Sequence, residues 1–159
     1  MCGRYALYGP TSRIREQFDL DHEFGFAPHY NTAPTMKALV VHSGSQSVRV
    51  ASLYRWGLIP VWAKDTTSGA KLINARGETV AEKPAFRTAF RRGRCLVPAN
   101  GFYEWKSVQE TGRAVKQPYY IRPRDEGELF GFAGLTERWY RPTGKKSTRA
   151  ASLRPAPIP

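Results

Sequence analysis

The stretch that best defines the fold class is residues 38–55, which read Ala-Leu-Val-Val-His-Ser-Gly-Ser-Gln-Ser-Val-Arg-Val-Ala-Ser-Leu-Tyr-Arg. An aliphatic run leads into a Ser-Gly-Ser-Gln turn, and Val48, Val50 and Leu53 then stand among polar neighbours. Short apolar runs on both sides of a turn rich in Ser and Gly are typical of a β-hairpin. The pattern therefore predicts two antiparallel strands in this part of the chain.

Three further runs downstream have the composition of strands. Each is rich in aromatic or β-branched residues and is separated from the next by polar turn residues. The runs are residues 95–98 continued by 101–105, residues 118–121 and residues 129–134. Together with the hairpin they predict a fold that is mostly β.

Two short helices are expected beside these strands. Near the start of the chain, a Thr-Ser pair can cap a helix that sets Ile14 and Phe18 four residues apart on one face. A second helix should begin near Pro84 and end at Gly93, because proline suits the first helical turn and glycine suits its end. The expected fold class is therefore α+β, mostly antiparallel β with a few short helices.

Size and composition favour one globular domain. The chain has 159 residues, 41% of them hydrophobic, and its aromatic residues supply enough apolar surface for one core. No apolar stretch approaches the roughly 18 residues of a membrane span, and no secretory signal is visible, so we expect a cytoplasmic protein without membrane contact. We also expect it to be a monomer. Two cysteines and three histidines lack the spacing of a metal site or a disulfide framework, so we expect neither metal nor cofactor.

The net charge of +12 suggests a polyanionic partner such as nucleic acid, because clustered Lys and Arg release condensed counterions on binding. The distribution of the charge qualifies this suggestion. Six of the 25 basic residues lie in residues 138–159, which contain no acid. The rest of the chain is only moderately basic.

Cys2 has chemistry that an internal cysteine lacks. Once Met1 is removed, Cys2 carries a thiol and an α-amine on adjacent carbons. The amine, with an ordinary pKa of about 7.7 to 8, condenses with an aldehyde, and the neighbouring thiol then closes a five-membered thiazolidine ring. A Met-Cys start alone is weak evidence, so the rest of the chain has to support this interpretation.

Five segments give that support, because together they resemble the family of SOS-response-associated peptidase (SRAP) domains, whose members cross-link to abasic sites in DNA. The resemblance runs from residue 1 to about residue 144 and implies a barrel-like domain. The segments are Met1-Cys-Gly-Arg-Tyr, Tyr30-Asn-Thr-Ala-Pro-Thr, Trp56-Gly-Leu-Ile-Pro-Val-Trp, Ile73-Asn-Ala-Arg-Gly-Glu-Thr and Arg94-Cys-Leu-Val-Pro-Ala-Asn-Gly-Phe-Tyr-Glu-Trp.

The resemblance implies a catalytic role for three residues. Cys2 matches the nucleophile that forms the DNA–protein cross-link, and the family is also credited with removing its own initiating residue. Asn74 matches the family's active-site asparagine, although an Asx-type turn cap is the alternative. Glu104 matches the catalytic glutamate, and a carboxylate that aromatic neighbours partly desolvate suits proton transfer.

Further residues match positions that face single-stranded DNA containing abasic sites. Arg4 and Arg76 would contact phosphates beside the lesion, where a guanidinium fork fits best. Trp56, Trp62 and Pro34 fall in motifs that resemble the family's DNA-facing wall, where aromatic faces stack on unpaired bases. The alternative for each of these three residues is a position in the core. For Trp56 a core position is nearly as well supported as a DNA contact.

A basic strip is expected along the second helix. Residues 83–94 include Arg87 and Arg91 and contain no acid, so the strip would follow a phosphate backbone. A solvated helix face is the equal alternative. No base-reading module is visible, so recognition should depend on the lesion and on single-strandedness.

The carboxyl-terminal part departs from the family pattern. The resemblance predicts a further strand and an active-site histidine there, and neither is recognisable, so we expect an incomplete domain at residues 1–144 and a disordered or aberrant tail at residues 145–159. Without that histidine, cross-linking, peptidase or lyase activity would be impaired. A cysteine peptidase, a non-catalytic nucleic-acid-binding module and an inactive fragment remain as alternatives.

Overall fold

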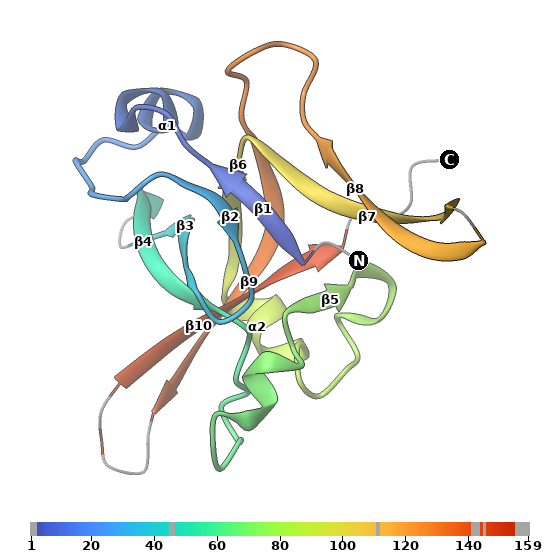
Figure 1. Cartoon of the computed structure of the whole chain (residues 1–159). Coiled ribbons are helices and arrows are strands. Elements are labelled where there is room, and N and C mark those ends of the chain that lie inside the picture. Colours follow the sequence, from blue (N-terminus) through green and yellow to red (C-terminus); the bar gives the residue numbers. More distant parts are fainter. Residues whose placement is uncertain (1–2, 45–46, 111, 141–143, 145, 155–159) are drawn as a thin grey trace.

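The computed structural model of the chain describes residues 3–44, 47–110, 112–140, 144 and 146–154. This part contains two α-helices, two short 3-10 helices and strands in two sheets (Figure 1). The strands are β1 Arg4–Leu7, β2 His29–Thr32, β3 Lys37–Ser43, β4 Arg49–Trp56, β5 Asn74–Arg76, β6 Arg94–Ala99, β7 Gly101–Glu110, β8 Arg113–Ile121, β9 Phe130–Tyr140 and β10 Lys146–Arg154. The helices are α1 Thr11–Phe18, η2 Thr67–Ala70, η3 Gly77–Thr79 and α2 Arg87–Arg92.

The larger sheet has the strand order β4-β3-β6-β9-β10-β5, and β10 pairs additionally with β4. This extra pairing joins β4, β3, β6, β9 and β10 into a ring, because each of them has a hydrogen-bonded neighbour on both sides. All pairs in this sheet are antiparallel except those of β10 with β4 and β5. The expected α+β class and barrel-like, mostly antiparallel architecture are confirmed.

The strand β10 corrects one expectation. Residues 146–154 lie in the segment that we expected to be an irregular tail, whereas they form a strand paired with β9, β4 and β5. Ala150 is buried, and its carbonyl accepts a hydrogen bond from the Gly57 amide at 2.6 Å. Partners on both sides hold this strand in place although its sequence has no apolar alternation. The last five residues of the expected tail lie outside the described residues.

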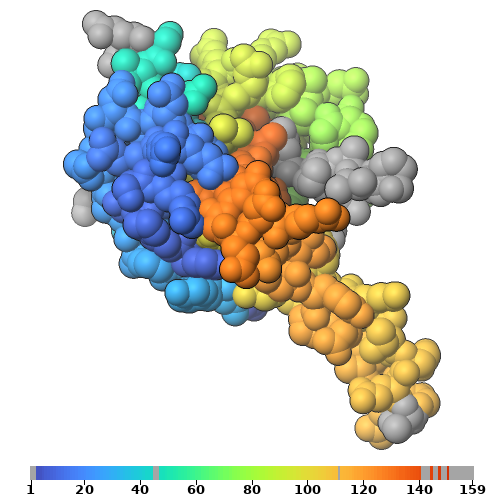
Figure 2. Space-filling view, turned by 90° about the horizontal axis from the view of Figure 1, so that it is seen from above, coloured from blue at the N-terminus to red at the C-terminus, as the bar shows by residue number. Residues whose placement is uncertain are grey.

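The smaller sheet has the order β2-β1-β7-β8. Strands β7 and β8 form a hairpin in continuous register from Phe102 opposite Ile121 to Glu110 opposite Arg113. The hairpin projects from the body as a two-stranded arm, and every residue of β8 is exposed (Figure 2). Strand β8 spans Arg113–Ile121, so it is longer than the run at residues 118–121 that the sequence indicated.

The main core lies between the two sheets and under α1. Ile14 and Phe18 of α1 are buried in it together with Val40 of β3 and Phe132 of β9. The expected hairpin is present as β3 and β4, with Leu39 opposite Leu53. The second helix is also present, but α2 begins at Arg87 rather than near Pro84, and it ends at Gly93 as expected.

In the described part of the chain no helix is long and apolar enough to cross a membrane.

Candidate active site

The first strand brings Gly3 beside Glu104. Strand β1 lies between β2 and β7, and Arg4 is directly opposite Tyr103. Continuing this antiparallel register by one residue places Gly3, which precedes the strand, opposite Glu104. Glu104 is half-buried, as its aromatic neighbours indicated. Residue 2 itself lies outside the described residues, so the position of its thiol is not assigned.

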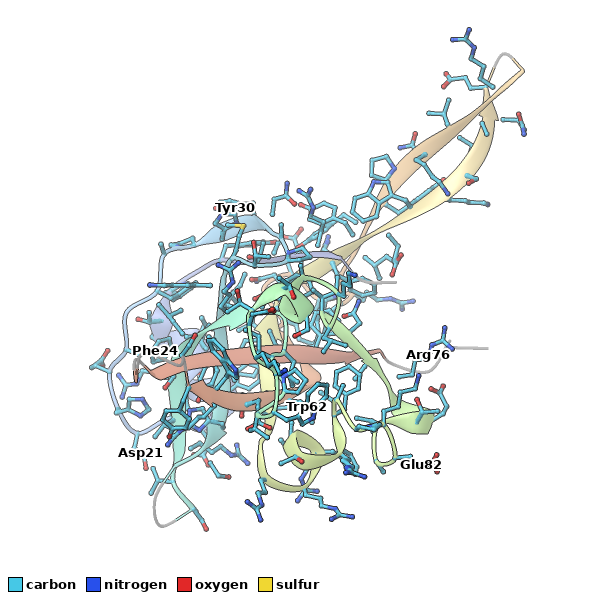
Figure 3. All side chains as sticks on the ribbon, turned by 90° about the horizontal axis from the view of Figure 1, so that it is seen from below. Asp21, Phe24, Tyr30, Trp62, Arg76 and Glu82 are labelled. Carbon is cyan, nitrogen blue, oxygen red and sulfur yellow. The ribbon has the colours of Figure 1, made fainter. Side chains whose placement is uncertain are left out.

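Asn74 and Arg76 occupy the short strand β5, which pairs in parallel with the end of β10. Ala75 between them is buried, Asn74 is half-buried and Arg76 is exposed. Because side chains alternate along a strand, Asn74 and Arg76 share the face opposite Ala75. Figure 3 shows Arg76 at the edge of the segment that connects β4 to α2.

Trp56 connects these two parts of the site. Its ring packs against Tyr5, the residue after Arg4, with 5.5 Å between the ring centroids. Its indole N–H donates a hydrogen bond of 2.8 Å to the carbonyl of Ile73, the residue before Asn74. One buried side chain therefore contacts the residue next to Arg4 and the residue next to Asn74, and so links β1 to β5.

This position decides the role of Trp56. The side chain is only 4% exposed, so its ring offers no face on which a base can stack. Of the two interpretations made from the sequence, packing is the one that fits the structure, and the DNA-facing one is not supported. A tryptophan in the interior needs a partner for its N–H, and the Ile73 carbonyl provides it.

Arg4 does not share a face with Glu104. Since Arg4 is opposite Tyr103, its side chain leaves the β1–β7 pair on the side away from Tyr5, Phe102 and Glu104. Its guanidinium donates a hydrogen bond of 3.1 Å to the Asn31 side-chain oxygen. The arginine is exposed, and a phosphate can approach it from the outer face of the smaller sheet.

The remaining DNA-facing candidates lie on loops and on α2. Trp62 is 65% exposed, which leaves its ring accessible for stacking (Figure 3). Pro34 is half-buried in the loop between β2 and β3, next to Thr35, whose amide bonds the Trp56 carbonyl. Arg87 and Arg91 are exposed, one helical turn apart on α2, so they form a cationic strip.

Asn100 is a residue of this region for which the sequence suggested no role. It is 5% exposed, and its side-chain oxygen accepts a hydrogen bond of 2.7 Å from the Tyr8 amide. The backbone N–H of Asn100 donates a hydrogen bond to the Ala6 carbonyl at 2.9 Å. These bonds anchor the end of β1 at the junction of β6 and β7. The Asn-Gly pair after a strand is a turn signal, and nothing in the sequence says that the asparagine is buried.

A second cysteine faces a histidine elsewhere in the fold. His42 of β3 is directly opposite Cys95 of β6. Burial raises the pKa of the Cys95 thiol to about 12, so the thiol stays protonated and is a poor nucleophile. His42 contacts the hydroxyls of Ser52 and Tyr54, at 3.4 Å each. This geometry does not favour a cysteine peptidase that uses Cys95.

The described residues contain no group of three or more His, Cys, Asp or Glu side chains arranged to hold a metal ion.

The family to which this chain belongs is identified by comparison with known proteins. The chain belongs to the SOS response associated peptidase (SRAP) family, whose model matches residues 1–153. The abasic site processing protein YoaM of Bacillus subtilis (strain 168) is 45% identical over 142 residues, which are 87% of this chain and 60% of that protein. The abasic site processing protein HMCES of Mus musculus is 35% identical over 144 residues, 76% of this chain and 40% of that protein.

Solved structures agree with this assignment. A protein from Bacteroides thetaiotaomicron superposes with a TM-score of 0.79 at 25% identity, covering 96% of this chain and 67% of that one. A protein from Bordetella bronchiseptica has a TM-score of 0.74 at 26% identity, covering 96% and 71%. The chain spans about 60% of the length of the Bacillus relative YoaM.

Proposed function

We propose that this chain processes abasic sites in single-stranded DNA by forming a covalent cross-link through Cys2 after removal of Met1. The observation that carries the proposal is the arrangement around Trp56. That side chain ties the start of β1, which follows the predicted nucleophile after Gly3, to the strand that presents Asn74. The names of the related abasic site processing proteins support the same substrate.

The proposed chemistry balances without a cofactor. The α-amine of Cys2 attacks the aldehyde carbon of the ring-opened sugar, and loss of one water gives an imine. The thiolate then adds to the imine carbon while the nitrogen takes up a proton, so that a thiazolidine ring forms. The net reaction joins protein and DNA and releases one water molecule.

Each neighbouring residue has a proposed part in these steps. Glu104, half-buried and opposite the residue after Cys2, transfers protons during addition and loss of water. Asn74 orients the amine or the open sugar through its amide. Arg4, Arg76 and the strip of Arg87 and Arg91 bind phosphates along the strand, and Trp62 stacks on a base beside the lesion.

The three histidines of the chain have hydrogen-bond partners other than Glu104 and Asn74. His22 accepts a bond from the Ala51 amide at 3.3 Å, His29 is on β2, and His42 contacts Ser52 and Tyr54. We propose that Glu104 carries proton transfer near Cys2.

A denaturing gel tests the proposal. Uracil-containing single-stranded DNA treated with a uracil glycosylase should give a shifted band that survives denaturation when mixed with the protein. Cys2→Ala should abolish this band, and Cys95→Ala, the control for the buried thiol, should retain it. A band that persists in Cys2→Ala contradicts the proposal. Binding that is strong, salt-sensitive and fully reversible in denaturant instead identifies a non-catalytic nucleic-acid-binding module.

A further inference from the structure

Four tyrosines and a tryptophan form a continuous aromatic patch on the outer face of the smaller sheet, which we call the tyrosine face. This side of the β1–β7 pair is opposite to the one that carries Glu104, because Arg4 and Tyr103 are cross-strand neighbours on it. None of the residues in the patch was singled out from the sequence as a DNA contact. The tyrosine face consists of Tyr8, Tyr30, Tyr103, Trp105 and Tyr120.

The tyrosines hold one another in fixed positions. The rings of Tyr8 and Tyr30 are stacked with 4.9 Å between their centroids, and those of Tyr103 and Tyr120 are 5.0 Å apart. The Tyr103 hydroxyl donates a hydrogen bond of 2.9 Å to the Tyr30 carbonyl. Burial, and then a hydrogen bond with Tyr8, raise the pKa of the Tyr120 hydroxyl. These contacts order the four tyrosines, which therefore have fewer rotamers to lose on binding.

Gly101 keeps this surface flat. A Cβ atom at position 101 would overlap the ring of Tyr120, so that ring lies directly over the glycine backbone. Gly101 is opposite Ala6 of β1. Small residues on these two neighbouring strands leave the room that the tyrosine rings occupy.

The outward faces of the patch are accessible. Tyr30 is 64% exposed and Trp105 is 41% exposed. Figure 3 shows Tyr30 at the outer edge of the body, on the side from which the β7–β8 hairpin projects. Trp105 lies two residues beyond Tyr103 at the base of that hairpin, opposite Pro118. A patch of this kind on a rigid sheet suits planar ligands that stack.

The charges along the patch point to a polyanion. Arg4 lies at one end beside Tyr103, and Lys116 lies on the same face beyond Trp105, where its ammonium donates to the Ser107 hydroxyl at 2.7 Å. The loop after β8 is acidic, and its Asp125, Glu126 and Glu128 line a groove together with Tyr8 and Tyr120. A strand that runs from Arg4 past Trp105 to Lys116 avoids this acidic loop.

We propose that the tyrosine face is a second binding surface for single-stranded nucleic acid, on which bases stack against Tyr30 and Trp105 while phosphates contact Arg4 and Lys116. The cations Arg4 and Lys116, which lie on either side of Trp105, favour nucleic acid over an uncharged protein surface as the ligand. The inference rests on the proposed function, because Arg4 joins this surface to the start of β1. The strand that carries the lesion would continue over the tyrosine face, and binding would strengthen with strand length.

Reversible binding to undamaged DNA tests this inference separately from cross-linking. Fluorescence anisotropy with a labelled oligothymidine of about 15 nucleotides should show Kd raised about tenfold in Tyr30→Ala and in Trp105→Ala, as expected for the loss of one stacked base. Tyr140→Ala is the matched control, because this tyrosine is 60% exposed at the far end of β9 and lies outside the tyrosine face. Its Kd should equal that of the unsubstituted chain.

A second probe separates stacking from charge. On a base-free strand of the same length, built from tetrahydrofuran units that carry no aldehyde, all of these variants should bind equally. Unchanged Kd for the oligothymidine in both variants would overturn the inference. If the two variants lose affinity for the oligothymidine but the unsubstituted protein never cross-links to abasic DNA, the tyrosine face is supported and the proposed function is rejected.

Discussion

Replacing Trp56 by phenylalanine should separate the hydrogen bond of this side chain from its packing. The phenyl ring keeps much of the contact with Tyr5, while the carbonyl of Ile73 loses its donor. An unsatisfied buried acceptor costs about 1–3 kcal/mol, and the smaller ring adds part of the roughly 0.5–1.5 kcal/mol of an aromatic pair. We therefore expect Trp56→Phe to lower the free energy of unfolding by about 1–4 kcal/mol, and to slow cross-linking because β5 is less well fixed.

Urea unfolding followed by far-ultraviolet circular dichroism measures this loss without depending on tryptophan fluorescence. Trp62→Phe is the matched control, because Trp62 is 65% exposed and its N–H lies 3.5 Å from the Pro84 carbonyl, a weak bond at most. Its unfolding free energy should change by no more than about 0.5 kcal/mol. If Trp56→Phe were as stable as the unsubstituted chain, the hydrogen bond to Ile73 would not be what holds β5 in place.

Three further results are expected. Gly57→Ala should destabilise the fold by about 1–3 kcal/mol in urea titrations, because Gly57 has φ of 117° and a Cβ there would overlap the Gly69 carbonyl, whereas Gly77→Ala meets no neighbouring atom and should be neutral. Burial raises the pKa of the Cys95 thiol to about 12, so between pH 8 and pH 10 only the thiol of the unfolded chain ionises, and the free energy of unfolding should fall by about 1–2 kcal/mol. In Cys95→Ala the free energy of unfolding should fall less over this range. An equal fall in the two proteins would refute this prediction. The double variant Arg87→Ala, Arg91→Ala should flatten the plot of log K against log salt by about 0.7 per lost phosphate contact.

The strands that could be predicted from the sequence are those whose own pattern indicates them. Residues 38–55 carry apolar runs on both sides of a turn, and the structure forms β3 and β4 there. Strands β1, β2 and β5 have three or four residues each, too few for an alternation to be visible. Strand β10 has no apolar pattern, and it forms because β9, β4 and β5 supply backbone partners from distant parts of the sequence. Pairing of this kind leaves no local signal.

The candidate site shows the same limit. The motifs selected Asn74, Glu104 and Trp56, but they could not say which of them faces the core. The burial of Trp56 depends on Tyr5 and Ile73, two residues in separate segments that meet only in the folded chain. The direction of Arg4 likewise follows from its register with Tyr103, which needs the pairing of β1 with β7. Residue types could be assigned from sequence, whereas faces required the strand register.

The anchoring of β1 bears directly on the proposed reaction. An amino-terminal amine on a loose chain end would lose conformational entropy each time it met an aldehyde. Here the strand after Gly3 is bonded on one edge to β2 and on the other to β7, and Asn100 and Trp56 fix it from within the fold. Much of the entropic cost of ordering the strand that follows the proposed nucleophile is therefore met when the domain folds. Substitutions that loosen this anchoring, such as Asn100→Ala, should consequently lower the rate of cross-linking more than the affinity for undamaged DNA, and a gel time course beside an anisotropy titration compares the two. Equal losses in both measurements would place the effect of the anchor on DNA binding and not on the positioning of the nucleophile.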